Sequence, residues 1–145
     1  APNPLNDPNW WASVRGSTVT LWTQVPQGGY SMQNAGHEMG HVFDNRTGRQ
    51  ARADLAAEQI SYMDANGQVI WVAGAGQFLN NAGYATAGPP WQQNNNPALG
   101  GNSSGEEFAD MFLGWAYNHF ANDAAGVARY KWIQSHMPGW IERIR

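Results

Sequence analysis

The pentapeptide His37-Glu38-Met39-Gly40-His41 constrains the fold of this 145-residue chain more than any other stretch. It fits the pattern H-E-x-x-H, and two histidines four positions apart share one face only when the backbone is helical. On a helix they can bind one metal ion, with the intervening glutamate beside them as a general base. The pentapeptide therefore predicts a helix that carries a metal site, and such a site needs a third protein ligand.

The composition argues against several other kinds of protein. The net charge of −3 comes from scattered acids and bases, with no basic run that would indicate nucleic acid binding. No apolar stretch approaches the ~20 residues that a membrane span needs. The chain has no cysteine, which excludes disulfides and a thiolate ligand to the metal. We expect a single domain over residues 1–145 that is monomeric, and secreted because it begins at Ala1 and is rich in Trp and Asn but poor in Lys.

Local patterns predict an α+β fold that is mostly helical, with a short-stranded sheet or hairpin. Residues 1–16 are expected to form an extended arm, and Ser17–Val25 a strand, because β-branched and apolar residues alternate there until Pro26. The segment Tyr62–Trp71 fits a hairpin around Asn66-Gly67, but a helix running on to Asp64 fits equally well. Helices are predicted over residues 32–45, 49–60, 105–120 and 123–136, with a long loop over residues 74–105.

Helical spacing divides the first predicted helix into two faces. His37 and His41 fall on one side with Asp44 close to them, and this side is expected to be polar and chelating. The opposite side is expected to face the core, and it holds Met32, Ala35, Met39, Val42 and Phe43. The helix over residues 105–120 is divided in the same way, with an apolar cluster opposite a stripe of Glu106, Asp110, Leu113 and Tyr117.

Glu106 is the residue that we predict as the third ligand. It lies on the polar stripe of its helix, and Asp110 follows one turn later on the same stripe. A carboxylate in that place can accept the N–H of a metal-binding imidazole and fix its tautomer. A site with a third histidine six residues after His41 is excluded, because Thr47 stands there.

The other acids and histidines receive structural interpretations. Glu107 is expected to be a first-turn acid favoured by the helix dipole. His119 is expected to pack within the fold, and His136 to lie at a helix C-terminus before Pro138, where capping accounts for it.

With these residues in place, the chain resembles a gluzincin, a zinc metallopeptidase, and most closely the catalytic domain of the anthrax lethal factor and Pro-Pro endopeptidase group. Residues 37–44 resemble that group's H-E-x-G-H-x-x-D, and residues 106–112 resemble its E-x-F-A-E-x-F, with Asp110 in place of the second Glu. The resemblance extends over roughly residues 35–48 and 100–140. It implies one zinc ion held by His37, His41 and Glu106, with Glu38 as the base. It also implies that Asp110 and Asp44 support the metal-binding side chains without binding the metal themselves.

The resemblance implies a zinc-dependent endopeptidase acting on peptides in extended conformation, with the strand before the metal helix as the edge that pairs with substrate. One position departs from the family, since Leu99 stands where the family has the tyrosine that stabilises the transition state. Tyr84 and Tyr117 are the alternatives for that role. The rival interpretations are a zinc site without turnover and a carbohydrate- or wall-binding module, for which the eight tryptophans are the reason.

Overall fold

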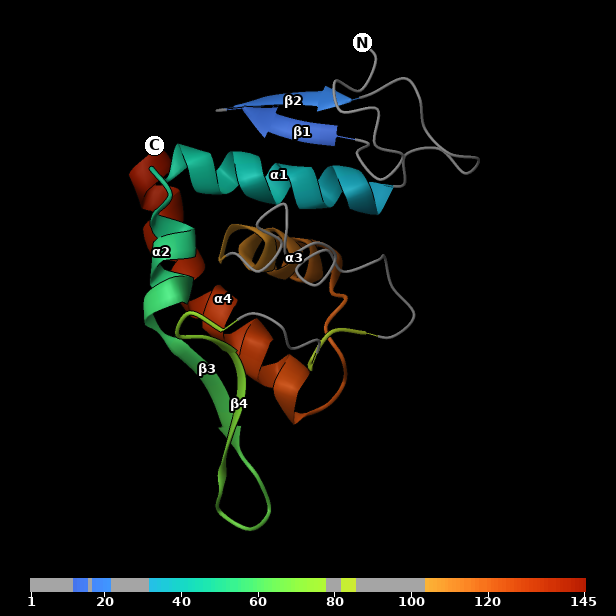
Figure 1. The fold of residues 1–145 in the computed structure, drawn as a ribbon, viewed down its shortest axis with the longest axis vertical. Helices are drawn as coiled ribbons and strands as arrows, with labels where there is room; N and C mark the ends of the chain where they lie inside the picture. The colour runs from blue at the N-terminus through green and yellow to red at the C-terminus, as the bar shows by residue number, and fades with distance from the viewer. Residues whose placement is uncertain (1–11, 16, 22–31, 78–81, 86–103) are drawn as a thin grey trace.

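The fold is seen in a computed structural model that describes residues 12–15, 17–21, 32–77, 82–85 and 104–145. These residues form an α+β fold that is mostly helical, as predicted, with two separate antiparallel hairpins (Figure 1). The helices are α1 (Met32–Arg46), α2 (Gln50–Ala57), α3 (Ser104–Tyr117) and α4 (Ala124–Ile144). The strands are β1 (Ala12–Arg15), β2 (Thr18–Leu21), β3 (Gln59–Met63) and β4 (Val69–Gly74). None of the described helices is both long and apolar enough to span a membrane.

The first hairpin corrects the predicted N-terminal arm. Residues 12–15 form β1, which pairs with β2 so that Val14 lies opposite Val19. The predicted strand Ser17–Val25 is described only as far as Leu21, and the rest of it lies outside the described residues. The hairpin lies along α1, on the side away from α3 (Figure 1).

Close packing of α1 against α3 determines which face of α1 is buried. A Cβ atom built on Gly40 would lie 2.8 Å from the Cα of Ala109, and one built on Gly36 would lie 2.8 Å from Cδ1 of Leu113. The face with the glycines and histidines is therefore the buried one, and Met39, expected in the core, is 51 % exposed. The prediction of an apolar core face on α1 is confirmed for Phe43, which packs against Phe108 and Phe112, and wrong for Met39 and Ala35. A hydrophobicity pattern takes no account of glycines that let two backbones approach.

The second hairpin resolves the choice between hairpin and helix for residues 62–71. Met63 lies opposite Val69, and Gly67 has a φ of +76° in the turn between them. The Asp64 carboxylate accepts the backbone N–H groups of Asn66 and Gln68 at 2.9 and 2.8 Å. This local side-chain capping favours the turn over a continued helix. The predicted helix over residues 49–60 accordingly ends at Ala57, and β3 begins at Gln59.

Helix α4 continues to Ile144, eight residues past its predicted end at His136, with Pro138 inside it. Proline removes one helical hydrogen bond and usually ends a helix. Here the turns around it bury Met137 and Trp140, and the Trp140 indole N–H donates to the Asp54 carboxylate at 2.8 Å. Tertiary burial of these two side chains outweighs the local preference to stop.

The core lies where α2, α3, α4 and the second hairpin meet. Helix α3 runs through its centre and is buried on most sides, so that even Leu113, on its predicted polar stripe, is 1 % exposed. The fully or nearly buried apolar side chains include Leu55, Ile60, Val72, Phe108, Met111, Ile133, Met137 and Trp140. Because α3 is held on most sides, its N-terminal turn is a rigid place for a functional side chain.

Candidate metal site

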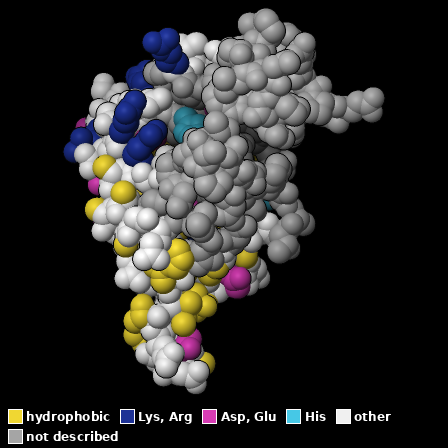
Figure 2. Space-filling model, viewed as in Figure 1, with side chains coloured by type: hydrophobic (Ala, Val, Ile, Leu, Met, Phe, Trp, Pro, Cys, Tyr) yellow, Lys and Arg dark blue, Asp and Glu magenta, His cyan; other side chains and the backbone are white. Residues whose placement is uncertain are grey.

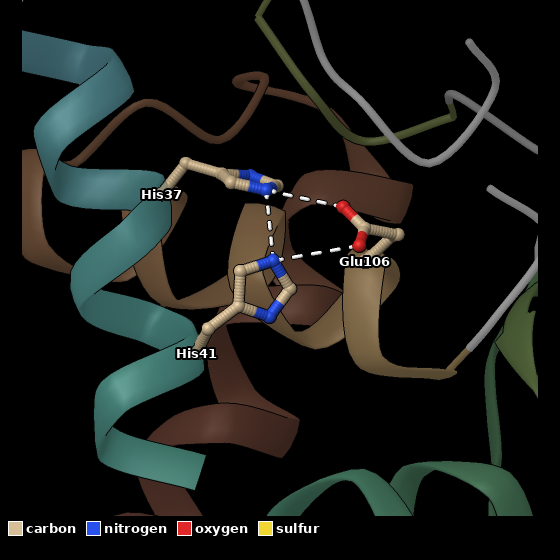
Figure 3. Close-up of side chains that lie close together, drawn as sticks. All are labelled: His37, His41 and Glu106. Atoms are coloured by element: carbon tan, nitrogen blue, oxygen red, sulfur yellow. Dashed lines mark hydrogen bonds and ion pairs between the residues drawn. The ribbon is translucent and has the colours of Figure 1, made fainter. Parts of the chain in front are cut away.

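His37 and His41 on α1 and Glu106 in the first turn of α3 come together across the contact between the two helices (Figure 3). Nε2 of His37 lies 3.2 Å from Nε2 of His41 and 3.2 Å from Oε2 of Glu106. Nε2 of His41 lies 3.5 Å from Oε1 of Glu106. Among the residues that the structure describes, these three are the one group of three or more side chains spaced to hold a metal ion.

The size of this triangle fits zinc. Tetrahedral zinc with bonds of about 2.0–2.1 Å to nitrogen and oxygen has its ligand atoms about 3.3–3.4 Å apart. The three observed separations, 3.2, 3.2 and 3.5 Å, lie on either side of that value, with Nε2 of His37 facing one oxygen of the Glu106 carboxylate and Nε2 of His41 facing the other. Two imidazoles and one carboxylate are also a ligand set that zinc prefers, and three protein ligands leave one position open.

Asp110 orients the imidazole of His37. Its Oδ1 lies 2.7 Å from Nδ1 of His37, and both side chains are fully buried, with relative exposures of 0 % and 1 %. An ionised carboxylate can only accept a hydrogen bond, so the Nδ1 proton points at Asp110. That tautomer leaves the lone pair of Nε2 facing the triangle, which is the arrangement that a metal ligand needs.

The electrostatics of the cluster favour a cation at its centre. Burial alone would lower the pKa of His37, but the carboxylates of Asp110 and Glu106 outweigh it and raise the pKa to about 10. Burial likewise would raise the pKa of Glu106, but hydrogen bonds and charge from His37 and His41 hold that pKa well below its ordinary value. A proton and a metal ion therefore compete for the same electron pairs.

Glu38 lies beside the triangle without joining it. Burial raises the pKa of its carboxyl group, the charges of His37 and His41 lower it, and the charge of Glu106 raises it again. All three metal-site residues are therefore within electrostatic reach of this carboxyl group. The described residues offer it no hydrogen-bond partner, and its side chain is 8 % exposed overall. A carboxylate beside a metal site with a raised pKa is suited to accept a proton.

Asp44 lies elsewhere than predicted. Its carboxylate accepts the backbone N–H of Arg52 at 2.9 Å and pairs with the guanidinium Nε of the same residue. Its backbone oxygen accepts the Thr47 hydroxyl at 2.7 Å. Asp44 is thus expected to stabilise the turn between α1 and α2, and the expectation that it supports the histidines directly is not met. It shares the face of His41 but lies one turn further along α1, and this axial rise of about 4.5 Å brings its side chain to Arg52 on α2.

A buried ion pair behind Glu106 was not indicated by the local pattern. Glu107 is in the first turn of α3, as predicted, but it is 0 % exposed and pairs with Nη1 of Arg129, which is also 0 % exposed. The Tyr84 hydroxyl donates to Oε1 of Glu107 at 3.1 Å, and the guanidinium lies 4.0 Å from the centre of the Tyr84 ring. One sequence signal does exist, because Arg129 shares a helix face with Ala125 and Ile133, two buried apolar residues.

The two tyrosines considered for the transition state lie in different surroundings. Tyr84 is buried in the Glu107–Arg129 cluster, so its hydroxyl serves that cluster. Tyr117 is 40 % exposed, with its ring beside Gly36. Leu99 lies outside the described residues.

The two remaining histidines, His119 and His136, lie apart from the three residues of the candidate metal site. His119 is half-buried and its ring lies 6.5 Å from that of Tyr117. His136 lies within α4, rather than at its end, and its Nε2 is 3.2 Å from the Glu58 carboxylate. Its ring packs between those of Trp132 and Trp140 at 4.4 and 5.2 Å.

The described tryptophans pack inward. Trp140 is 2 % exposed, and Trp71, Trp115 and Trp132 are half-buried. These four form no exposed aromatic platform of the kind that stacks on sugars. The four others, at positions 10, 11, 22 and 91, lie outside the described residues.

A scan against protein-family models and searches of curated proteins and of solved structures find no match for this chain. The chemistry of the site itself therefore carries the functional interpretation.

Proposed function

We propose that this protein is a zinc-dependent endopeptidase of the gluzincin kind. The observation that carries the proposal is the group of two imidazole nitrogens and a carboxylate at zinc-ligand spacing, with the buried carboxyl group of Glu38, whose pKa is raised, next to it. The metal would be held by His37, His41 and Glu106. Asp110 would fix the imidazole of His37 in the tautomer that binds a cation.

When bound, zinc supplies Lewis acidity, which makes a water molecule more acidic and polarises the carbonyl group of a scissile peptide bond. The part of the chain itself in the reaction is proton transfer. Glu38 accepts a proton from the attacking water, and it then delivers that proton to the leaving nitrogen. The raised pKa of its carboxyl group brings it closer to the range in which both steps are efficient.

The substrate is proposed to be a peptide in extended conformation. The β1–β2 hairpin precedes α1 and lies along it, and within the described residues no third strand pairs with it. A strand with an unpaired edge can bind an extended peptide through backbone hydrogen bonds. A peptide bound in this way would run parallel to the helix that carries His37 and His41.

Replacing Glu38 by glutamine tests the assignment. We expect the variant to bind one zinc per chain, as the parent does, because Glu38 is not a ligand, while hydrolysis falls by about 10²–10⁴-fold. Metal analysis and cleavage of a mixed peptide library give the two measurements. Met39→Gln is the matched control, because it puts the same side chain on the exposed neighbouring position and should leave both properties unchanged.

Two results would contradict the proposal in different ways. Activity of Glu38→Gln within about tenfold of the parent would remove Glu38 as the base. One zinc per parent chain, with no cleavage of any peptide, would instead favour the zinc site without turnover.

A further inference from the structure

Arginines gather at the turn that connects α1 to α2, in a chain whose net charge is −3. Arg46 ends α1, Arg49 precedes α2, and Arg52 lies in the first turn of α2, with no acidic residue between positions 46 and 52. We call these three residues the arginine corner. Lys and Arg side chains cluster at this end of the molecule, beside a histidine side chain that reaches the surface (Figure 2).

The arginine corner is joined to both helices that form the metal site. Asp44, three residues after His41, holds the backbone N–H and the guanidinium of Arg52. On the other side, a Cβ atom built on Gly105 would lie 2.9 Å from Nη1 of Arg52. The guanidinium therefore lies against the residue that directly precedes Glu106. Its positive charge is fixed beside the metal site.

Two of the three charges of the arginine corner, those of Arg46 and Arg49, are available to a ligand, while that of Arg52 is paired with Asp44. Arg46 and Arg49 are exposed, and neither takes part in an ion pair between described residues. Arg49 also has a φ of +66°, directly after Gly48 with a φ of +71°. Glycine or asparagine is the usual choice for such a backbone. The backbone of Arg49 is held in this conformation by its N–H, which donates to the carbonyl oxygen of Asp44 at 2.8 Å.

We propose that the arginine corner binds acidic side chains of the peptide substrate on one side of the metal site. The inference rests on the proposed peptidase function, because it assumes a peptide that lies across the metal. From His41 to Arg46 the helix advances by five residue steps, a rise of about 7.5 Å. An extended peptide covers that distance in about two or three residues. Aspartate or glutamate two to four residues from the scissile bond would then reach the arginines.

Peptides that differ only in charge test this inference. We would prepare fluorescent peptides with Glu, Gln or Lys at the second to fourth positions on either side of a fixed centre. Their binding to zinc-loaded Glu38→Gln protein is read by anisotropy, and their cleavage by the parent as kcat/KM. We expect the acidic peptide to be preferred over the neutral one by about 3- to 10-fold, which is the scale of two or three exposed ion pairs. The preference should weaken in 0.5 M salt, where the Debye length falls to about 4 Å.

The variant Arg46→Gln/Arg49→Asn removes two charges and keeps a residue that tolerates positive φ at position 49. We expect it to lose the preference for acidic peptides. Lys131→Glu is the matched control, because it makes the same change in net charge at an exposed position on α4. It should keep the preference.

The two arms of the experiment separate this inference from the proposed function. Cleavage without any charge preference, or an equal preference in the double variant, overturns the arginine corner and leaves the peptidase standing. Binding of acidic peptides that depends on Arg46 and Arg49, without cleavage, supports the arginine corner and counts against the peptidase. Tighter binding to vesicles containing phosphatidylglycerol than to acidic peptides would overturn the assignment to a peptide.

Discussion

Replacing Gly40 by alanine tests whether the close contact of α1 and α3 sets the geometry of the metal site. The new Cβ would lie 2.8 Å from the Cα and 3.0 Å from the carbonyl oxygen of Ala109. Carbon atoms in contact are about 3.5–4.0 Å apart, so relief of the clash requires the helices to separate by about 1 Å. Backbone atoms are on the receiving side, so no side-chain rotation can provide this space.

The separation should affect stability and metal binding together. Overpacking costs about 1–3 kcal/mol, and the better helix propensity of alanine returns at most about 1 kcal/mol. We therefore expect a net loss of about 1–2 kcal/mol, or about 3–8 °C in the Tm of a chain of this size. His37 and His41 move with α1 while Glu106 stays with α3, and zinc bonds tolerate only about ±0.2 Å. Zinc affinity should fall by about 10- to 100-fold, as when an outer-shell partner is lost.

Chelator competition gives the zinc affinity, and thermal unfolding of the metal-free protein gives the change in stability. Gly139→Ala is the control, since a Cβ on this exposed residue of α4 meets nothing within 4 Å. It should raise stability slightly and leave zinc affinity unchanged. If Gly40→Ala binds zinc as tightly as the parent, the approach of the two helices does not determine the site, and the reasoning fails.

Three further predictions follow from the contacts behind the site. Asp110→Asn should lower zinc affinity by about 10- to 100-fold, because it weakens the hydrogen bond that orients His37. Asp64→Asn makes the same charge change in the second hairpin and should leave the affinity unchanged. Equal affinities of the two variants in chelator competition would refute this. Because the metal-free pKa of His37 is raised to about 10, zinc must displace its proton, so affinity should rise by about tenfold per pH unit from pH 6.5 to 8.5. Calorimetry at pH 8 in buffers of different ionisation enthalpy should then detect about one released proton, and none would mean that the imidazole is already neutral. Arg129→Met should lower the free energy of unfolding, measured in urea, by about 3–5 kcal/mol, because it leaves the buried Glu107 carboxylate without its charged partner. Adding Glu107→Gln should recover part of this loss. A loss below about 1 kcal/mol would show that the ion pair contributes little to stability.

The local sequence was sufficient for features that depend on short-range physics. The spacing of His37 and His41 predicted a helix with both imidazoles on one face, and α1 has both. The turn at Asn66-Gly67 is also stabilised locally by the Asp64 carboxylate, but the sequence left hairpin and helix equally open there and the structure decided between them. Placing Glu106 near the histidines required more, namely the polar stripe that it shares with Asp110.

The tertiary structure decided what depends on neighbours distant in the chain. Met39 is exposed because the glycines on the opposite face bring α1 against α3, and no periodicity of apolar residues contains that information. Helix α4 continues past Pro138 because Trp140 is buried against α2, and burial competes with local preference only once the chain is folded.

The charged side chains also divide into those whose arrangement the sequence predicts and those whose arrangement only the tertiary structure determines. The sequence by itself determined the helix, the two imidazoles and the glutamate beside them, since these depend on spacing within one turn. Only the tertiary structure paired Glu107 with Arg129 and placed the arginine corner beside Glu106. The physical reason is that electrostatic interactions depend on distance and burial in space, and residues separated by 22 or more positions acquire both only when α2, α3 and α4 pack together.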